Sequence, residues 1–317
     1  MAHAFIFPGQ GSQQVGMGRA LAEAFASARQ VFAEVDEALG GHLSRTMWEG
    51  PENELTLTEN AQPALMAVSL AVVRTLETEF GVRVDAARFV AGHSLGEYSA
   101  LAAAGALELA EAARLLRTRG RAMQQATPIG LGAMAALLGL DYDAAREVAA
   151  EAAQGEVCEA ANDNAPGQVV VSGHKAAVER AVEIAKERGA KRALMLSVSA
   201  PFHCALMGPA AEVMRDALDE AEIGTPRPPL VANVTAGAVK DPEEIRRRLV
   251  EQVTGTVRWR ESVGFMAGGG VHLFAELGAG KVLAGLVKRS AAGAEAVSAG
   301  APKELEALAA RLGQEDA

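Results

Sequence analysis

A serine lies between two glycines in the segment Gly92-His93-Ser94-Leu95-Gly96, which matches the pattern G-x-S-x-G. In this pattern a strand turns sharply into a helix, and side chains two residues before and after the serine would collide. An apolar segment precedes the pattern and an alanine-rich helical pattern follows it. Ser94 is therefore a candidate nucleophile, and the alternative is a serine that caps the following helix.

A serine hydroxyl needs a base before it can attack an acyl group. Of the six histidines, His203 is the best candidate, because it precedes a predicted helix where the chain returns from a predicted inserted unit. His93 adjoins the serine, but neighbouring side chains diverge at such a turn, so we expect it to pack beside the site. Cys204 suggests a Cys-His pair with His203, which we reject because adjacent residues do not easily make that contact.

The group that orients the histidine is left open by the sequence. An aspartate or glutamate has this role in Ser-His-Asp triads, and Glu97, Asp163 and Asp241 are all possible. A backbone carbonyl is the alternative, because the helix predicted over 242–253 ends near Gly255 and its last carbonyls have no helical partner. The negative end of that helix would also favour an imidazolium.

One arginine lies on the apolar face of the helix predicted over 107–126. Arg114, Arg117 and Arg121 share a solvent-facing stripe on a helical wheel, whereas Arg119 falls among the apolar residues. A buried guanidinium is unfavourable unless it is paired. Arg119 therefore either forms an internal salt bridge or awaits a carboxylate or phosphate of a ligand, which its planar fork can bind bidentately.

The glycine-rich segment FPGQGSQQVGMG follows the first predicted strand. Gly9 and Gly11 are followed by Gln14 where a dinucleotide-binding loop would have its third glycine, and the phosphate-binding loop of NTPases is absent too. We expect this loop to form one side of a substrate cleft at the edge of the sheet. No group of His, Cys and Asp has metal-ligand spacing, so no metal is expected.

Short apolar segments alternate with helical patterns along the chain, which predicts an α/β fold with a mainly parallel sheet covered by helices. The expected strands lie at 4–7, 88–92, 230–234 and 271–276, and the expected helices at 18–39, 61–80, 95–104, 107–126, 205–221, 242–253 and 279–289.

The middle of the chain has a different order of elements, β-α-β-β-α-β, which is typical of a ferredoxin-like unit. Its strands are predicted at 132–140, 157–162, 168–173 and 191–198, with a turn at NDNAPG, and its helices at 141–153 and 174–188. We predict an inserted subdomain over about 128–197. The large subdomain then consists of residues 1–127 and 198–317.

Composition narrows the class of protein and its partners. The formal net charge of −10 argues against nucleic acid or an anionic membrane as the main partner. Two cysteines are too few for a disulfide framework, and no apolar run has the length of a membrane span. The N-terminus has no basic leader and resembles a first strand, so we expect a cytoplasmic protein.

Several segments, in order, resemble the family of malonyl-CoA:acyl carrier protein transacylases, the acyltransferases of fatty-acid synthesis. They are FPGQGSQ, GHSLGEYSALAAAGAL, RGRAMQQA, NAPGQVVVSG and GAGKVLAGL, and together they extend over nearly the whole chain. The resemblance implies an α/β-hydrolase-like large subdomain with a ferredoxin-like insertion, which agrees with the element order.

The resemblance also implies roles for particular residues in the reaction. It implies that Ser94 is the nucleophile, that His203 is the base, and that the backbone carbonyl of Gln252 orients the histidine. The oxyanion hole would consist of the backbone N–H groups of Gln10 and Leu95.

Further residues are implied for substrate binding. Arg119 would bind the malonyl carboxylate, which would explain its place on the apolar face. Phe202, directly before the histidine, implies a preference for malonyl over methylmalonyl groups, worth ~1–3 kcal/mol on size alone. The remaining residues implied to line the site are Gln62, His93, Met123 and Asn162.

The implied reaction is a ping-pong transfer of malonyl from malonyl-CoA to the phosphopantetheine thiol of acyl carrier protein, without a metal or redox cofactor. A monomer is expected. Because the carrier protein and this chain are both acidic, we expect docking at a local basic cluster, for which Lys186, Arg188, Lys191 and Arg192 are candidates. Three alternatives are a serine hydrolase or thioesterase, an acyltransferase of a polyketide pathway, and a non-catalytic module that binds CoA or acyl carriers.

Overall fold

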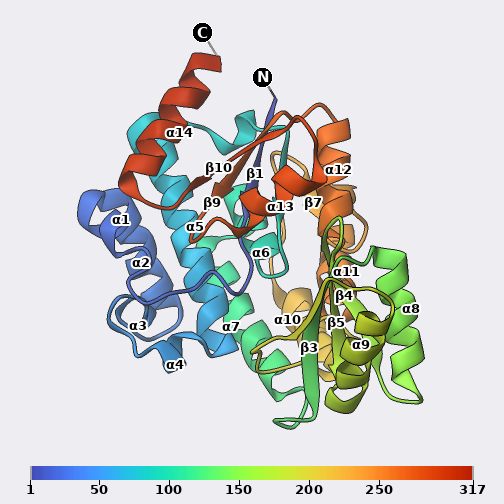
Figure 1. The fold of residues 1–317 in the computed structure, drawn as a ribbon. Helices are drawn as coiled ribbons and strands as arrows, with labels where there is room; N and C mark the ends of the chain where they lie inside the picture. Colours follow the sequence, from blue (N-terminus) through green and yellow to red (C-terminus); the bar gives the residue numbers. More distant parts are fainter. Residues whose placement is uncertain (1, 316–317) are drawn as a thin grey trace.

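Two β-sheets of different type form the framework of the protein (Figure 1). In this computed structural model, which describes residues 2–315, the larger sheet has six strands in the order β10-β9-β1-β2-β7-β8. All its neighbouring strands are parallel except the β7–β8 pair. Its strands are β1 (His3–Phe7), β2 (Phe89–Gly92), β7 (Leu230–Ala232), β8 (Gly237–Val239), β9 (Leu273–Leu277) and β10 (Glu295–Ala299).

Helices pack on both faces of the large sheet, as the alternation of β1 requires. Phe5 and Phe7 point into one apolar core, and Ala4 and Ile6 point into another on the opposite face. The helices that contribute to the first core include α1 (Arg19–Ala24), α2 (Ala26–Ala38), α3 (Leu43–Glu49), α4 (Glu52–Leu55), α5 (Thr58–Phe80), α6 (Gly96–Ala103), α7 (Leu109–Gln125), α10 (Gly208–Glu220), α11 (Pro242–Thr254) and α14 (Pro302–Glu315). Those of the second core are α12 (Trp259–Gly268) and α13 (Val282–Ser290).

The second sheet is antiparallel and is formed by one continuous part of the chain. Its strand order is β4-β5-β3-β6, with strands β3 (Gly132–Leu138), β4 (Cys158–Ala165), β5 (Gln168–His174) and β6 (Arg192–Met195). The helices α8 (Tyr142–Ala153) and α9 (Lys175–Glu187) pack on it around a separate apolar core. The short 3-10 helices η1 (Val84–Ala86) and η2 (Ala205–Met207) complete the elements. The prediction of a mainly parallel sheet with a second β unit is therefore confirmed.

Some predicted elements differ from those in the structure. The helix expected over 18–39 is interrupted at Phe25, whose backbone is extended and whose ring packs edge-on against Phe80. The strand expected to end at Asn162 continues to Ala165, because two irregularities in register let β4 remain paired with β5. The turn is correspondingly shorter, with Gly167 at a φ of 68°.

Several elements were not expected from the sequence, namely α3, α4, α12, β8, β10 and α14. Both β8 and β10 are edge strands that pair on one side only, so their sequences need less apolar character than a central strand. Within residues 2–315, no helix combines the length and the apolar character needed to cross a bilayer.

Candidate active site

The turn between β2 and α6 has the strained geometry that the G-x-S-x-G pattern predicts. Ser94 has a φ of 53°, a left-handed conformation that is uncommon for a residue other than glycine. A Cβ placed on Gly92 would lie 1.9 Å from the carbonyl carbon of Gly96, and one on Gly96 would lie 2.3 Å from the carbonyl oxygen of Phe7. The glycines are thus required by contacts with the backbone. The Ser94 side chain does not cap α6.

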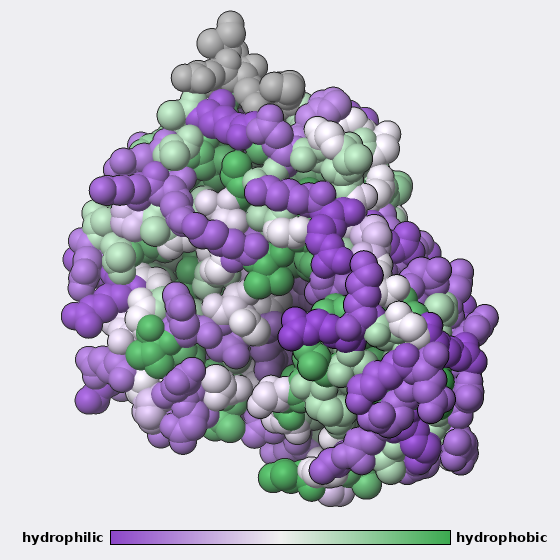
Figure 2. Space-filling view, viewed as in Figure 1, coloured by the Kyte–Doolittle hydropathy of each residue, from purple (hydrophilic) through white to green (hydrophobic). Residues whose placement is uncertain are grey.

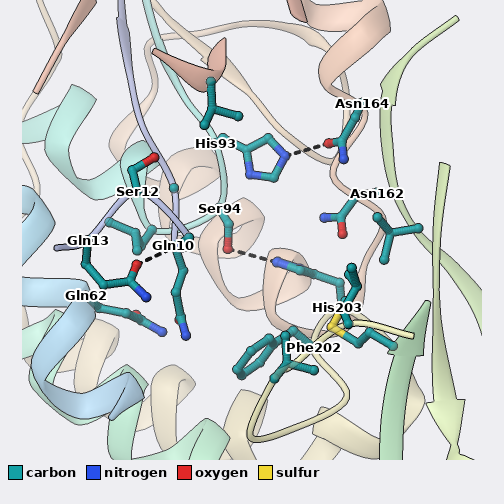
Figure 3. A pocket seen from close by; sticks show the side chains of 18 of the residues that line it. Gln10, Ser12, Gln13, Gln62, His93, Ser94, Asn162, Asn164, Phe202 and His203 are labelled. Atoms are coloured by element: carbon teal, nitrogen blue, oxygen red, sulfur yellow. Dashed lines mark hydrogen bonds between the residues drawn. The ribbon is translucent and has the colours of Figure 1, made fainter. Parts of the chain in front are cut away.

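The nucleophile candidate and the base candidate are in contact. Ser94 Oγ lies 2.8 Å from His203 Nε2 (Figure 3). His203 Nδ1 lies 2.8 Å from the backbone carbonyl oxygen of Gln252. Because a carbonyl oxygen only accepts, Nδ1 carries the proton and Nε2 accepts the hydrogen bond of the serine hydroxyl. Gln252 lies in the last turn of α11, so the arrangement has the geometry of the backbone-carbonyl alternative.

The electrostatic surroundings keep this imidazole neutral. Burial, and then the positive charge of Arg119, lower the pKa of His203 to about 3. The neighbouring thiol keeps its proton, because burial raises the pKa of Cys204 to about 11. Its Sγ donates to the carbonyl of Pro201. His203 is therefore available as a base, whereas Cys204 is a buried, protonated thiol.

The three acids considered as partners of the histidine all have other contacts. Asp163 pairs with Arg260 at 2.8 Å, and Asp241 caps α11 by accepting the backbone N–H of Glu244. Glu97 accepts hydrogen bonds from Gln252 and Asn233. None of them contacts His203, so the acid alternatives are wrong, and the position is occupied by a carbonyl at a helix end.

Arg119 lies beside Ser94 and is buried, with 1% of its surface exposed. Its Nη1 donates to Gln62 Oε1 at 2.9 Å, and its Nη2 donates to Gln252 Oε1 at 2.8 Å and to Ser94 Oγ at 3.1 Å. The guanidinium also lies over the ring of Tyr98. Within residues 2–315 it has no carboxylate within salt-bridge distance, so the internal salt bridge considered from the sequence is absent and the cation faces the nucleophile.

Asn233, which follows β7, is a site residue that sequence reasoning missed. Its Oδ1 accepts the backbone N–H of Ser94 at 2.8 Å, and its Nδ2 donates to the carbonyl of Gly92 at 2.7 Å. One amide thus holds both sides of the strained turn. The prediction placed Asn233 inside the strand expected over 230–234, and the observed β7 ends at Ala232, which leaves Asn233 at the sheet edge where Ser94 also lies.

A cavity of about 270 Å³ opens beside Ser94, and Figure 2 shows a recess between the parts of the molecule formed by the two sheets. Every residue proposed from the sequence lines it except Gln252, which lies behind Arg119; these are Gln10, Gln62, His93, Ser94, Leu95, Arg119, Met123, Asn162, Phe202 and His203. His93 points its Nε2 at Asn164 Oδ1, 2.8 Å away (Figure 3). The ring of His93 also packs against Trp259. Burial lowers the pKa of His93.

The opposite wall of the cavity was not expected from the sequence. It is contributed by the antiparallel sheet, the segment after β6 and helix α13, with Met134, Asn164, Gln168, Val170, Leu196, Ser197, Val198, Val282, Leu283 and Leu286. Ser12 and Gln13 of the N-terminal loop also line the cavity, which agrees with the loop as one side of a cleft.

Two backbone N–H groups near Ser94 are free to bind an anion. Within residues 2–315, neither the N–H of Gln10 nor that of Leu95 has a hydrogen-bond partner in the protein. The first N–H belongs to the loop after β1 and the second to the turn after β2. These two strands are adjacent and parallel. The carboxyl ends of such strands meet at one edge, which is where an oxyanion hole beside Ser94 would lie.

The basic cluster expected on the inserted unit, which lies from the end of α9 to the start of β6, is partly neutralised by acids of that unit. Lys186 pairs with Glu183 at 2.7 Å, and Arg188 pairs with Glu147 and Glu151 of α8. Lys191 and Arg192 have no salt bridge to any described residue. Figure 2 shows hydrophilic residues gathered over the α8 and α9 region.

The chain is similar to known acyltransferases over nearly its whole length. A family model described as acyl transferase domain matches residues 4–311. A malonyl CoA-acyl carrier protein transacylase of Bacillus subtilis is 45% identical over 314 residues, 99% of this chain and 98% of that protein. A crystal structure of an acyl-carrier-protein-S-malonyltransferase from Bartonella henselae is 53% identical with a TM-score of 0.96, covering 99% and 100% of the two chains.

A second solved structure includes a carrier protein. It is described as a type II PKS acyl-carrier protein in complex with its malonyl-transacylase. The chain that matches is 44% identical with a TM-score of 0.95, and the match covers 98% of this chain and 100% of that one.

Proposed function

The chain belongs to the acyl transferase domain family, and we propose that it transfers the malonyl group of malonyl-CoA to the phosphopantetheine thiol of an acyl carrier protein. One observation carries the proposal: Ser94 Oγ lies within hydrogen-bond distance of both His203 Nε2 and Arg119 Nη2. A nucleophile, a neutral base and a cation for the acyl carboxylate thus meet at one atom.

In the first half of the proposed ping-pong mechanism, Ser94 becomes acylated. Its Oγ attacks the thioester carbon of malonyl-CoA while His203 Nε2 takes the hydroxyl proton. The N–H groups of Gln10 and Leu95 bind the oxyanion of the tetrahedral intermediate. The C–S bond then breaks, the imidazolium returns its proton to the CoA sulfur, and malonyl-serine remains.

In the second half, the phosphopantetheine thiol of the carrier protein attacks the malonyl-serine. His203 takes the thiol proton and returns it to Ser94 Oγ as the ester bond breaks. The Gln252 carbonyl, 2.8 Å from Nδ1, stabilises the imidazolium in both halves. Every step is an acyl or proton transfer, so the chemistry requires no metal or redox cofactor.

Substrate choice follows from the walls of the cavity. Arg119 is proposed to bind the malonyl carboxylate, and Phe202, which is 9% exposed, to limit room for a methyl branch. Gln62 holds Arg119 and contacts the sulfur of Met123 at 3.7 Å, and His93 and Asn162 line the same space.

We further propose a finer description of the fold. The strand order β4-β5-β3-β6 with α8 and α9 on one face supports a ferredoxin-like unit inserted over about 128–197. The strand–serine–helix turn on a parallel sheet supports an α/β-hydrolase-like large unit from residues 1–127 and 198–317.

For carrier-protein docking, we propose Lys191 and Arg192, because Lys186 and Arg188 are paired within their own unit. We also propose that the protein is a monomer, that it acts in the cytoplasm and that it supplies malonyl groups for fatty-acid elongation. The two buried free cysteines suit a reducing compartment. Charge reversal at Lys191 and Arg192 is expected to raise KM for the carrier protein and leave KM for malonyl-CoA unchanged.

The test of the function is intact-mass analysis after incubation with malonyl-CoA. We expect one malonyl adduct, located on the peptide that contains Ser94, which disappears when holo carrier protein is added. Ser94→Ala should abolish the adduct, while Ser99→Ala, which removes a buried hydroxyl on the following helix α6, should retain it.

The rival functions predict other results. Steady release of malonate without a carrier protein would indicate a hydrolase, and binding of malonyl-CoA that survives Ser94→Ala with no adduct in the wild type would indicate a binding module. Faster transfer to a type II polyketide carrier protein than to one of fatty-acid synthesis would place the enzyme in a polyketide pathway.

A further inference from the structure

One buried carboxyl beside the site has no role in the proposed mechanism. Glu97 lies on α6, three residues after Ser94, and is 1% exposed. Burial raises the pKa of Glu97 to about 7. Within residues 2–315 it forms no salt bridge, and its Oε1 has no hydrogen-bond partner. A carboxyl in this position is unfavourable for stability, so a functional reason for it is worth seeking.

The partner of Glu97 is the side chain of Gln252. Glu97 Oε2 accepts a hydrogen bond from Gln252 Nε2, and it also lies 3.4 Å from the backbone N–H of Asn233. The same Nε2 lies 3.0 Å from the carbonyl oxygen of Ser94 and 3.2 Å from Asn233 Oδ1. All three groups around Nε2 are acceptors, so the amide can have only one orientation.

That orientation directs the amide oxygen at Arg119. Gln252 Oε1 accepts from Arg119 Nη2 at 2.8 Å, and Gln62 Oε1 accepts from Nη1 at 2.9 Å. The guanidinium is therefore held by two neutral side-chain carbonyls, those of Gln62 and Gln252. The carboxyl of Glu97 contacts the Gln252 amide and not the guanidinium itself. A carboxylate in direct contact would occupy the N–H groups that a substrate carboxylate needs. A reversed Gln252 amide would instead point its N–H groups at the guanidinium.

We propose that Glu97 is a positioning residue for acyl-group selection: it fixes the Gln252 amide, which fixes Arg119 beside Ser94. This inference rests on the proposed function, because it assigns Arg119 to the carboxylate of the acyl group. The backbone carbonyl of Gln252, which orients His203, does not depend on Glu97. Loss of the relay should therefore affect carboxylated acyl groups and spare the base.

The test compares acylation of Ser94 by malonyl-CoA and by acetyl-CoA, followed by quenched intact mass. Glu97→Met keeps the length of the side chain and removes its acceptors. We expect its rate constant with malonyl-CoA to fall about ten- to a hundredfold, the range for a hydrogen bond to a charged group. The rate with acetyl-CoA should change by less than about twofold.

Two variants serve as controls for the relay. Glu97→Gln keeps an oxygen that accepts from Gln252 and Asn233, so it should restore the malonyl preference. Ser99→Ala, buried on the same helix without a hydrogen-bond partner, should leave both rates unchanged. In a Gln252→Met background, Glu97→Met should cause no further loss of preference, because the route to Arg119 is already gone.

The proposal is overturned if folded Glu97→Met lowers the malonyl and acetyl rates equally, or if it keeps the malonyl preference. It is also overturned if adding Glu97→Met to the Gln252→Met variant lowers the malonyl preference as much as it does in the wild type. If Glu97→Met does not fold, Gln252→Met decides, and an unchanged preference there removes the relay. If the wild type itself takes no malonyl group on Ser94, it is the proposed function that fails.

Discussion

The two ends of the cavity are held by different kinds of contact. At the reacting end, Ser94 and His203 both have left-handed backbones, with φ of 53° and 58°, and each side chain is directed by its own strained residue. At the recognition end, Arg119 lies in a regular helix and is held by side chains from other helices, Gln62 and Gln252.

This difference indicates which changes each end tolerates. The reacting end depends on backbone shape and on one imidazole, so its loss should affect every acyl substrate. The recognition end depends on a network of side chains, so its loss should affect only acyl groups that carry a carboxylate. The following predictions test that division, from the largest expected effect to the smallest.

Replacing the base should affect all substrates alike. In His203→Ala, we expect acylation by malonyl-CoA and by acetyl-CoA to fall by about 10²–10⁴, the usual contribution of a general base. Cys204→Ala, which alters the adjacent buried thiol, is the matched control and should retain acylation. A loss restricted to malonyl-CoA would contradict the division between the two ends.

Removing the guanidinium should separate the substrates. In Arg119→Ala, we expect the rate constant with malonyl-CoA to fall about 10²–10³-fold, since two charge-assisted hydrogen bonds are lost. Transfer of acetyl should persist or improve. Arg114→Ala, an exposed arginine of the same helix that pairs with Glu111, should change neither rate. An unchanged ratio would remove Arg119 from the acyl site.

Adding a methyl group to the turn should break the reacting end through the backbone. In Gly96→Ala, the new Cβ would meet the carbonyl oxygen of Phe7 at 2.3 Å, so we expect a loss of about 3 kcal/mol or more of stability. Gly264→Ala, in α12 with open space around it, should be neutral or stabilising by up to about 1 kcal/mol. Denaturant unfolding of both variants measures the contrast.

The buried acid behind the recognition end should make stability depend on pH. The pKa of Glu97 is raised from 4.5 to about 7 in the folded protein, so folding favours the protonated carboxyl. The stability that this protonation contributes is fully present below about pH 4.5 and is lost as pH rises through 7. Glu97→Gln cannot titrate, so its stability relative to the wild type should rise by up to about 3 kcal/mol between pH 5 and pH 8. A constant difference across that range in unfolding experiments would disprove the shift.

Enlarging the cavity should have the smallest effect. In Phe202→Ala, we expect the preference for malonyl-CoA over methylmalonyl-CoA to weaken by ~1–3 kcal/mol, measured as the ratio of kcat/KM. Phe265→Ala, an exposed ring on α12, is the control and should leave the ratio unchanged.

The sequence by itself determined the parts of the site that depend on nearby residues. Gly92 predicted the turn because the collision that it avoids, with Gly96, occurs within five residues, whereas Gly96 avoids a collision with Phe7 of the neighbouring strand. The period of α7 placed Arg119 on the buried face because helical geometry repeats every few residues. The mainly parallel sheet and the separate β unit followed from the order of apolar segments.

Only the tertiary structure decided which distant groups meet. The residues alone left Glu97, Asp163, Asp241 and a helix-end carbonyl open as partners of the histidine, and only the family resemblance named Gln252. Packing brings the carbonyl of Gln252, 49 residues away in the chain, to His203. The Asn233 amide lies 139 residues from Ser94, and the Gln252 side chain 155 residues from Glu97. Such contacts depend on how whole elements pack, and no local pattern of residues encodes them.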